Sequence, residues 1–217
     1  MIRGAIFDVD GTLLDSMSVW DTLGARYLHT LGLEPRENLA DTFRTFTMEQ
    51  SARYIQQHYG VSRSTEEITA GFHRLTEDFY RFEAPLRPGV PELLNRLQHE
   101  GVSMAMATAS HRALVEAALD RCGVLPCFQF LLTCQEAGSK TEPGIYEAAR
   151  LRLNTPKQDT WVFEDAAHAA QTAARAGFPV LGVREPHEED QQGLRACSTV
   201  YLTDFLHTEP FWRFVSH

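Results

Sequence analysis

Ala-Ile-Phe-Asp-Val-Asp-Gly-Thr-Leu-Leu, at residues 5–14, joins an apolar run to two acids and a glycine. The apolar residues 2–9 predict a short buried strand, and Gly11 marks the turn that follows it. Alternate residues of a strand face the same side, so Asp8 and Asp10 are expected to point into one pocket. Two carboxylates held this close repel each other, and a cation or a shared proton relieves that repulsion. The plainer alternative is a strand end with two solvated acids.

The composition indicates a soluble globular protein: the 217 residues are 43% hydrophobic and 23% charged. That length suits one full core and a small second lobe. We find no signal peptide and no apolar run long enough for a bilayer, so we expect a cytoplasmic protein, and a monomer. The net charge of -9 disfavours nucleic acid and membrane surfaces as partners. The four cysteines lack metal-ligand spacing, which favours free thiols.

The chain between residues 15 and 84 predicts helices and no strand. Asp15 is expected to cap the first of them. Two capping boxes open later helices, at Thr47–Gln50 and Ser64–Glu67. We therefore predict a helical domain, 15–84, inserted directly after the first strand.

From residue 85 onward, helices and strands alternate. The expected strands are 102–108, 128–132, 161–163, 180–183 and 199–202. Such alternation predicts an α/β fold, in which a parallel sheet carries helices on both faces and binds ligands at the carboxyl ends of its strands. Residues 1–14 and 85–217 would form this core domain. The acidic run 185–190 is interpreted as a solvated loop.

Polar residues follow several of the expected strands. Thr108 ends one, and Ser110 begins a helix whose backbone N–H groups suit a phosphate oxygen; the alternative is that Ser110 only caps that helix. Lys140 stands just before Pro143, which opens another helix, although an isolated lysine is usually a surface residue. Glu164–Asp165 places adjacent acids at a further strand end. They are either a capped helix start or part of a carboxylate cluster suited to Mg²⁺.

These four stretches, in this order, resemble the motifs of the haloacid dehalogenase superfamily, whose phosphatase branches begin with Asp-x-Asp-Gly-Thr-Leu. The resemblance covers nearly the whole chain and implies a Rossmann-like core with a small helical cap at 15–84. It implies that Asp8 is the nucleophile and Asp10 the general acid and base. The phosphoryl group would be held by Thr108, Ala109 and Lys140. A Mg²⁺ cofactor would be held by Asp8, the backbone carbonyl of Asp10, Glu164 and Asp165.

One departure from the family pattern lies after the second acid pair. The family usually has a serine there and a glycine a few residues later, whereas this chain has Ala166 and Ala169 with His168 between them. We therefore expect the groups around the metal to differ from the usual arrangement.

The resemblance implies a Mg²⁺-dependent phosphatase of a small phosphorylated metabolite, and a β-phosphoglucomutase-type mutase is the alternative. A non-catalytic binding protein, a dehalogenase and a phosphonatase fit less well, the last because 15–84 contains no lysine. Trp20 falls where the mutase has its cap histidine, and Met48 lies near the place of its phosphate-binding arginine. These residues favour a ring-bearing leaving group over a second phosphate. Arg44 or Arg53 could still supply positive charge, so Trp20 and Arg44 are the expected substrate contacts in the cap.

Overall fold

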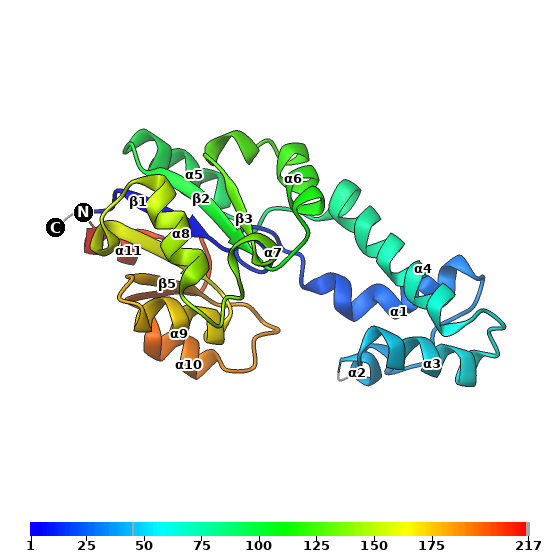
Figure 1. The fold of residues 1–217 in the computed structure, drawn as a ribbon. Coiled ribbons are helices and arrows are strands. Elements are labelled where there is room, and N and C mark those ends of the chain that lie inside the picture. The colour runs from blue at the N-terminus through cyan, green and yellow to red at the C-terminus, as the bar shows by residue number, and fades with distance from the viewer. Residues whose placement is uncertain (45, 216–217) are drawn as a thin grey trace. The chain divides into compact units, whose positions relative to one another are not determined.

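The structure is a computed structural model, and it describes residues 1–44 and 46–215. The chain divides into two compact units, one formed by Met1–Asp15 with Pro85–His217 and the other by Ser16–Ala84. Within the described residues, all strands belong to the first unit and the second contains only helices (Figure 1). Among all the residues that the structure describes, no helix is both long enough and apolar enough to cross a membrane.

The first unit is built on a six-stranded sheet of order β3-β2-β1-β4-β5-β6 (Figure 1). All neighbouring strands pair in parallel, which confirms the predicted α/β class. From β1 the chain moves outward in both directions, so β1 lies at the switch point where such sheets bind ligands. The strands are β1 (Gly4–Phe7), β2 (Ser103–Thr108), β3 (Leu131–Thr133), β4 (Thr160–Glu164), β5 (Val180–Val183) and β6 (Val200–Leu202).

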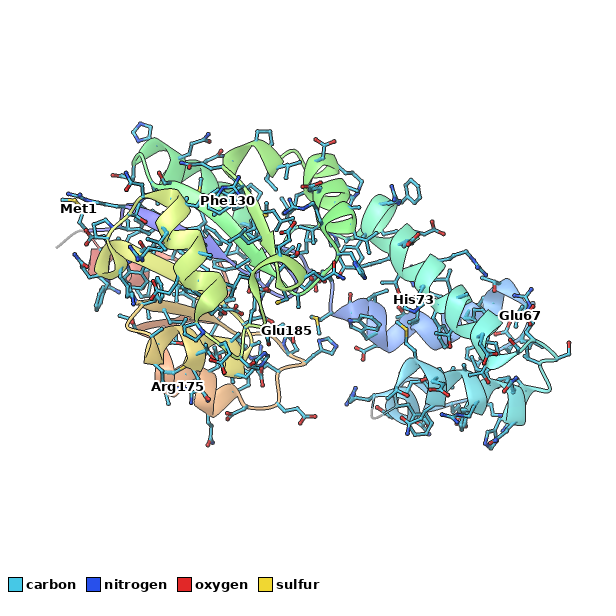
Figure 2. The ribbon with its side chains drawn as sticks, viewed as in Figure 1. Met1, Glu67, His73, Phe130, Arg175 and Glu185 are labelled. Carbon is cyan, nitrogen blue, oxygen red and sulfur yellow. The ribbon has the colours of Figure 1, made fainter. Side chains whose placement is uncertain are left out.

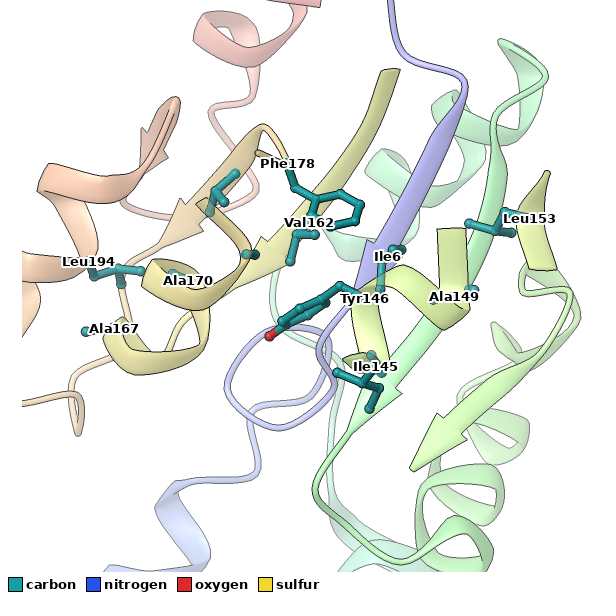
Figure 3. Packing of buried hydrophobic residues seen from close by; sticks show 14 residues of the cluster. Ile6, Ile145, Tyr146, Ala149, Leu153, Val162, Ala167, Ala170, Phe178 and Leu194 are labelled. Atoms are coloured by element: carbon teal, nitrogen blue, oxygen red, sulfur yellow. The ribbon is translucent and has the colours of Figure 1, made fainter. Parts of the chain in front are cut away.

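Helices cover both faces of the sheet, as the buried strands require. Alternation along β4 shows the division: Val162 joins one core cluster, whereas Trp161 and Phe163 pack edge-on against Phe211 on the other side. The Val162 face is covered by α8 (Gly144–Leu153), α9 (Ala167–Arg175) and α10 (Gln191–Cys197) (Figure 3). Phe211 belongs to α11 (Glu209–Val215).

The remaining elements of this unit are α5 (Val90–His99), α6 (Arg112–Arg121), η2 (Leu125–Cys127), α7 (Cys134–Ala137) and η3 (Lys157–Asp159). Two predicted strands differ from the structure by more than one residue. The first strand ends at Phe7, so Asp8 and Asp10 lie in the loop beyond it. The strand expected at 128–132 is β3, which begins three residues later and ends one residue later; ahead of it, Gln129 N already donates to Met104 O of β2 at 2.8 Å.

The second unit consists of α1 (Ser18–Thr30), α2 (Leu39–Phe43), α3 (Met48–Tyr59), α4 (Thr65–Asp78) and the π-helical turn η1 (Phe79–Glu83). Both predicted capping boxes are confirmed, at Thr47–Gln50 and Ser64–Glu67. Its helices share an apolar core of buried side chains, which are Leu23, Tyr27, Leu28, Leu39, Ala52, Ile55, Ile68 and Phe72. The predicted cap at Asp15 was wrong, because α1 begins after Met17 without a side-chain cap.

The two segments that connect the units are paired inside the first unit. The backbone N–H of Asp15 donates to the carbonyl oxygen of Pro85 at 2.9 Å. Leu14 and Leu86 form an antiparallel bridge next to it. Asp15 is therefore held by this pairing, which explains why it does not begin α1.

Candidate active site

The carboxyl ends of β1, β2 and β4 carry the predicted site residues. Asp8 directly follows β1, and its backbone N–H donates to the carbonyl oxygen of Phe163 in β4 at 2.9 Å. Thr108 ends β2, Glu164 ends β4 and Asp165 follows it. Because the strands are parallel and adjacent, these ends meet at one edge of the sheet.

Three acids and one lysine meet in a buried cluster at the carboxyl ends of these strands. Asp8, Glu164 and Asp165 each offer a carboxylate oxygen, and the three oxygens lie within 4.8 Å of one another. Lys140, from the segment between α7 and α8, donates to Asp8 Oδ1 and to Glu164 Oε1, the latter at 2.7 Å. The side chains of all four are buried. The alternative of a surface lysine is therefore wrong for Lys140.

Burial and charge shift the pKa of Asp8, Asp165 and Lys140. Burial, reinforced by the charges of Glu164 and Asp10 and opposed by Lys140, raises the pKa of Asp8 to about 7. Burial also raises the pKa of Asp165, and the charges of Asp8 and Glu164 add to the effect. Burial alone would lower the pKa of Lys140, but its two carboxylate partners outweigh burial and raise that pKa. Lys140 is thus charged at neutral pH, and additional positive charge would favour ionised Asp8 and Asp165.

Gly11 and Thr12 hold Asp165 in place. The Thr12 hydroxyl donates to Asp165 Oδ1 at 2.7 Å. Gly11 adopts a φ of +79°, and a Cβ on it would lie 2.3 Å from Asp165 Oδ2. The carbonyl oxygen of Gly11 accepts a hydrogen bond from Arg87, which also donates to the carbonyl oxygen of Arg184 at 2.6 Å. Only glycine allows the loop after β1 to approach the acid this closely.

Asp10 and Thr108 are linked through Ser110. The Ser110 hydroxyl donates to Asp10 Oδ2 at 2.6 Å, and its backbone N–H donates to Thr108 Oγ1 at 3.0 Å. The predicted helix-capping role of Ser110 was wrong, since α6 begins after His111 without a side-chain cap. Ala109, between the two hydroxyl residues, is exposed.

Tyr146 reaches the cluster from α8. Its hydroxyl donates to Glu164 Oε1 at 2.9 Å. Burial first, and then the charge of Glu164, raises the pKa of Tyr146, so the hydroxyl keeps its proton and acts as a donor. The arrangement of Asp8 and Asp10 beside a buried lysine and a second acid pair suits transfer of an anionic group to a carboxylate.

A family model described as haloacid dehalogenase-like hydrolase matches residues 2–177. The chain belongs to this family. The match includes every residue of the cluster, and it confirms the resemblance seen in the motifs.

Named relatives of this haloacid dehalogenase-like hydrolase include two phosphatases. Validoxylamine A 7'-phosphate phosphatase of Streptomyces hygroscopicus subsp. limoneus is 28% identical, over 88% of this chain and 89% of the relative. Hexitol phosphatase A of Escherichia coli is 29% identical, over 85% and 84%. A solved structure from Thermotoga maritima, provisionally called a β-phosphoglucomutase, has a TM-score of 0.86 at 21% identity and covers 99% of this chain and 100% of that one. At that identity the structural likeness shows the fold alone.

The family resemblance implies Mg²⁺, and the donor atoms of this hydrolase fit that ion. Three carboxylates supply the hard oxygen ligands that Mg²⁺ prefers. Glu164 Oε2 is buried and has no hydrogen-bond partner among the described residues, although its neighbour Oε1 has two. A buried carboxylate oxygen without a partner is costly, and a bound cation removes that cost.

The acidic run 185–190 is a loop, as predicted, and Glu189 and Asp190 are exposed, but Glu185 and Glu188 bond to the rest of the unit. Glu185 lies in the loop after β5 (Figure 2). It is buried and accepts hydrogen bonds from His187. Glu188 Oε2 accepts a hydrogen bond from the backbone N–H of Ala167 at 2.9 Å. Since Ala166 at the start of α9 has no side-chain acceptor, Glu188 caps that helix in its place. Glu188, from the acidic run, thus supplies the hydrogen-bond acceptor that the usual family serine would provide at the start of α9.

Trp20 and Arg44 belong to the helical unit of this hydrolase. Trp20 is 42% exposed, and Arg44 pairs with Asp41 and Asp21 at 3.6 and 4.0 Å. Their substrate contacts stay predictions.

Sequence reasoning missed the roles of Thr12, Tyr146 and Ser110. Thr12 lies inside the first motif, and a hydroxyl beside a tight turn is a signal that could have suggested it. Tyr146 and Ser110 contact partners 18 and 100 positions away in the sequence, and no local pattern marks such contacts.

Proposed function

We propose that this chain is a phosphatase that hydrolyses a small phosphorylated metabolite through a phosphorylated Asp8. The observation that supports it most is the convergence of Asp8, Glu164 and Asp165 around Lys140 at the switch point of the sheet. Its phosphatase-named relatives, which match most of the chain, favour the same chemistry.

The proposed reaction has two steps on the chain's own groups. An oxygen of Asp8 attacks phosphorus and the bond to the leaving oxygen breaks, while Asp10 gives that oxygen a proton. Asp10 then takes a proton from water, which attacks the phosphorus and releases Asp8 and inorganic phosphate. The hydrogen bond from Ser110 holds Asp10 in one orientation for both transfers.

Binding of the phosphoryl group must overcome the charge of the site. Four carboxylates, of Asp8, Asp10, Glu164 and Asp165, lie in the site, and Lys140 pairs with two of them, Asp8 and Glu164. Lys140, the Thr108 hydroxyl and the backbone N–H groups near Ala109 would bind the phosphoryl oxygens. When bound to Asp8, Asp10, Glu164 and Asp165, Mg²⁺ supplies positive charge that stabilises those oxygens in the transition state.

The substrate class follows from the relatives and from the helical unit. Their names point to phosphorylated polyols and sugar-like rings. Trp20 offers an exposed ring that would pack against such a leaving group, and Arg44 would contact its polar edge. No specific observation favours the mutase alternative, since the Thermotoga maritima likeness concerns the fold and the helical unit contains no lysine for a second phosphate.

Release of inorganic phosphate tests this proposal. The full chain would be assayed with hexitol, sugar and nucleoside phosphates and with p-nitrophenyl phosphate, beside Asp8→Asn. We expect turnover that chelation abolishes, that Mg²⁺ restores and that Asp8→Asn lacks. Equal phosphate release by Asp8→Asn would show that Asp8 is not the nucleophile. Incubation with β-glucose 1-phosphate and a trace of the bisphosphate separates the two classes, because glucose 6-phosphate forming faster than free phosphate would establish a mutase.

A further inference from the structure

Tyr146 is a buried residue of the first unit whose hydroxyl has no role in the proposed reaction. Its ring lies in the core cluster between α8, α9 and the sheet, with Ile6, Val162 and Ala170 (Figure 3). Its hydroxyl is 2.9 Å from Glu164 Oε1 and 3.5 Å from the carbonyl oxygen of Ala169. A hydroxyl donates one proton, and the nearer, charged acceptor forms the stronger bond. The proton of Tyr146 is therefore directed to Glu164.

The two oxygens of Glu164 are used very differently. Oε1 accepts from Tyr146 and also from Lys140, at 2.7 Å. A carboxylate oxygen has two lone pairs, so these donors fill the acceptor capacity of Oε1. Oε2 is buried and has no hydrogen-bond partner among the residues that the structure describes. Only Oε2 is left for a cation.

We infer that Tyr146 is a positioning residue for the metal site, which acts by occupying Glu164 Oε1 so that Oε2 alone, in one orientation, is left for a cation held together with Asp8 and Asp165. The inference rests on the proposed metal site and assigns to Tyr146 a role in choosing the ion. Mg²⁺ requires near-ideal octahedral geometry, whereas Ca²⁺ accepts irregular shells and carboxylates that bind through both oxygens. A carboxylate restricted to one oxygen therefore favours Mg²⁺ over Ca²⁺.

Tyr146→Phe tests the inference because it removes the hydroxyl and keeps the ring in the core. Oε1 then regains a free lone pair and the carboxylate can turn. We expect the Mg²⁺ affinity to fall about 10- to 100-fold, as for other groups that orient a metal ligand. The Ca²⁺ affinity should fall less, so the preference for Mg²⁺ over Ca²⁺ decreases.

Tyr201→Phe is the matched control. The Tyr201 hydroxyl donates to Gln191 Oε1 at 2.9 Å, and Tyr201 lies on β6, at the far edge of the sheet from β2. Calorimetric titration of the full chain with MgCl₂ and, separately, with CaCl₂ would compare wild type and both variants, and thermal unfolding without metal would compare their stability. We expect Tyr201→Phe to bind both ions as the wild type does. At saturating Mg²⁺, the kcat of Tyr146→Phe should return close to that of the wild type.

Each contrary result has its own meaning. A wild-type Mg²⁺ affinity in Tyr146→Phe overturns the positioning role and leaves the metal site intact. An equal loss of Mg²⁺ and Ca²⁺ affinity overturns the selectivity and reduces the hydroxyl to general support of the site. A wild type that binds neither ion, yet releases phosphate, overturns the metal site together with the inference and leaves the phosphatase reaction standing.

Discussion

The Ser110 hydroxyl donates a hydrogen bond to Asp10 Oδ2, and the two oxygens are 2.6 Å apart. This hydrogen bond joins the loop after β2 to the loop after β1, and the backbone N–H of Ser110 is itself held by Thr108. An acid that must give and take a proton gains from such a fixed orientation. Ser110 thus couples the strand end that is proposed to bind the phosphoryl group to the proposed acid and base.

Ser110→Ala should lower kcat with a much smaller change in stability. A hydrogen bond to a charged group contributes about 1.5–3 kcal/mol, which corresponds to about 10- to 100-fold in rate. Ser110→Thr keeps the hydroxyl and should retain more activity. Ser198→Ala, which removes a 2.6 Å bond to the carbonyl oxygen of Leu194, is the control in steady-state assays. A wild-type kcat in Ser110→Ala would show that Asp10 needs no such orientation.

Lys140→Met should abolish turnover and destabilise the metal-free protein. Its ammonium is buried against Asp8 and Glu164, and removal of one partner of a buried ion pair costs about 3–5 kcal/mol. Urea unfolding in the presence of a chelator measures this loss, and Mg²⁺ should reduce it. Lys157, the only other lysine, is partly exposed, so Lys157→Met should keep full activity. Unchanged stability of Lys140→Met would contradict the buried network.

The stability of the metal-free protein should depend on the pKa of Asp8. That pKa is about 7 in the folded chain and about 4 when unfolded, so the folded state binds the proton more tightly. The contribution of Asp8 is therefore fully present below about pH 4 and is lost as the pH rises to about 7. Thermal unfolding of the wild type and of Asp8→Asn, both with a chelator, isolates the contribution of Asp8 to stability. The wild type should lose melting temperature relative to the variant as the pH rises from about 5 to 8, and Mg²⁺ should reduce that loss; parallel pH curves would contradict the prediction.

Gly11→Ala should destabilise the fold and weaken Mg²⁺ binding. The left-handed backbone costs about 1–2 kcal/mol for a residue with a Cβ, and the added atom would lie 2.3 Å from Asp165 Oδ2. Gly101→Ala separates the two effects, because Gly101 has a φ of +73° and nothing within 4 Å of the added Cβ. Urea unfolding and Mg²⁺ titration compare the variants. Equal effects at both positions would show that the contact with Asp165 is unimportant.

Much of the fold could be predicted because its signals are local. The capping boxes at Thr47 and Ser64 and the strand at 180–183 are marked by adjacent residues, and the structure has them as expected. The proximity of Asp8 and Glu164 could be predicted because neighbouring parallel strands place their carboxyl ends at the same end of the sheet.

The errors arise where distant contacts override local preference. Asp15 is a good helix cap in isolation, but in the structure its backbone N–H donates to the carbonyl oxygen of Pro85, and α1 begins later. Glu185 stands in a run of acids that predicts a solvated loop, yet it is buried, and Gly11 and Arg87 lie close to it. Each of these contacts joins residues that are far apart in the sequence, and so the sequence around one residue does not contain it.

The hydrogen bond between Asp15 and Pro85 has a consequence for how this chain can change over time. The residues at the two ends of the helical insertion are hydrogen-bonded to each other. All the carboxylates of the cluster and Lys140 belong to the first unit, outside the insertion. Helices between these ends can be lengthened, replaced or exchanged as a cassette without moving a strand. If the helical unit contacts the substrate as proposed, such a layout would let substrate recognition change while the residues proposed for the reaction stay the same.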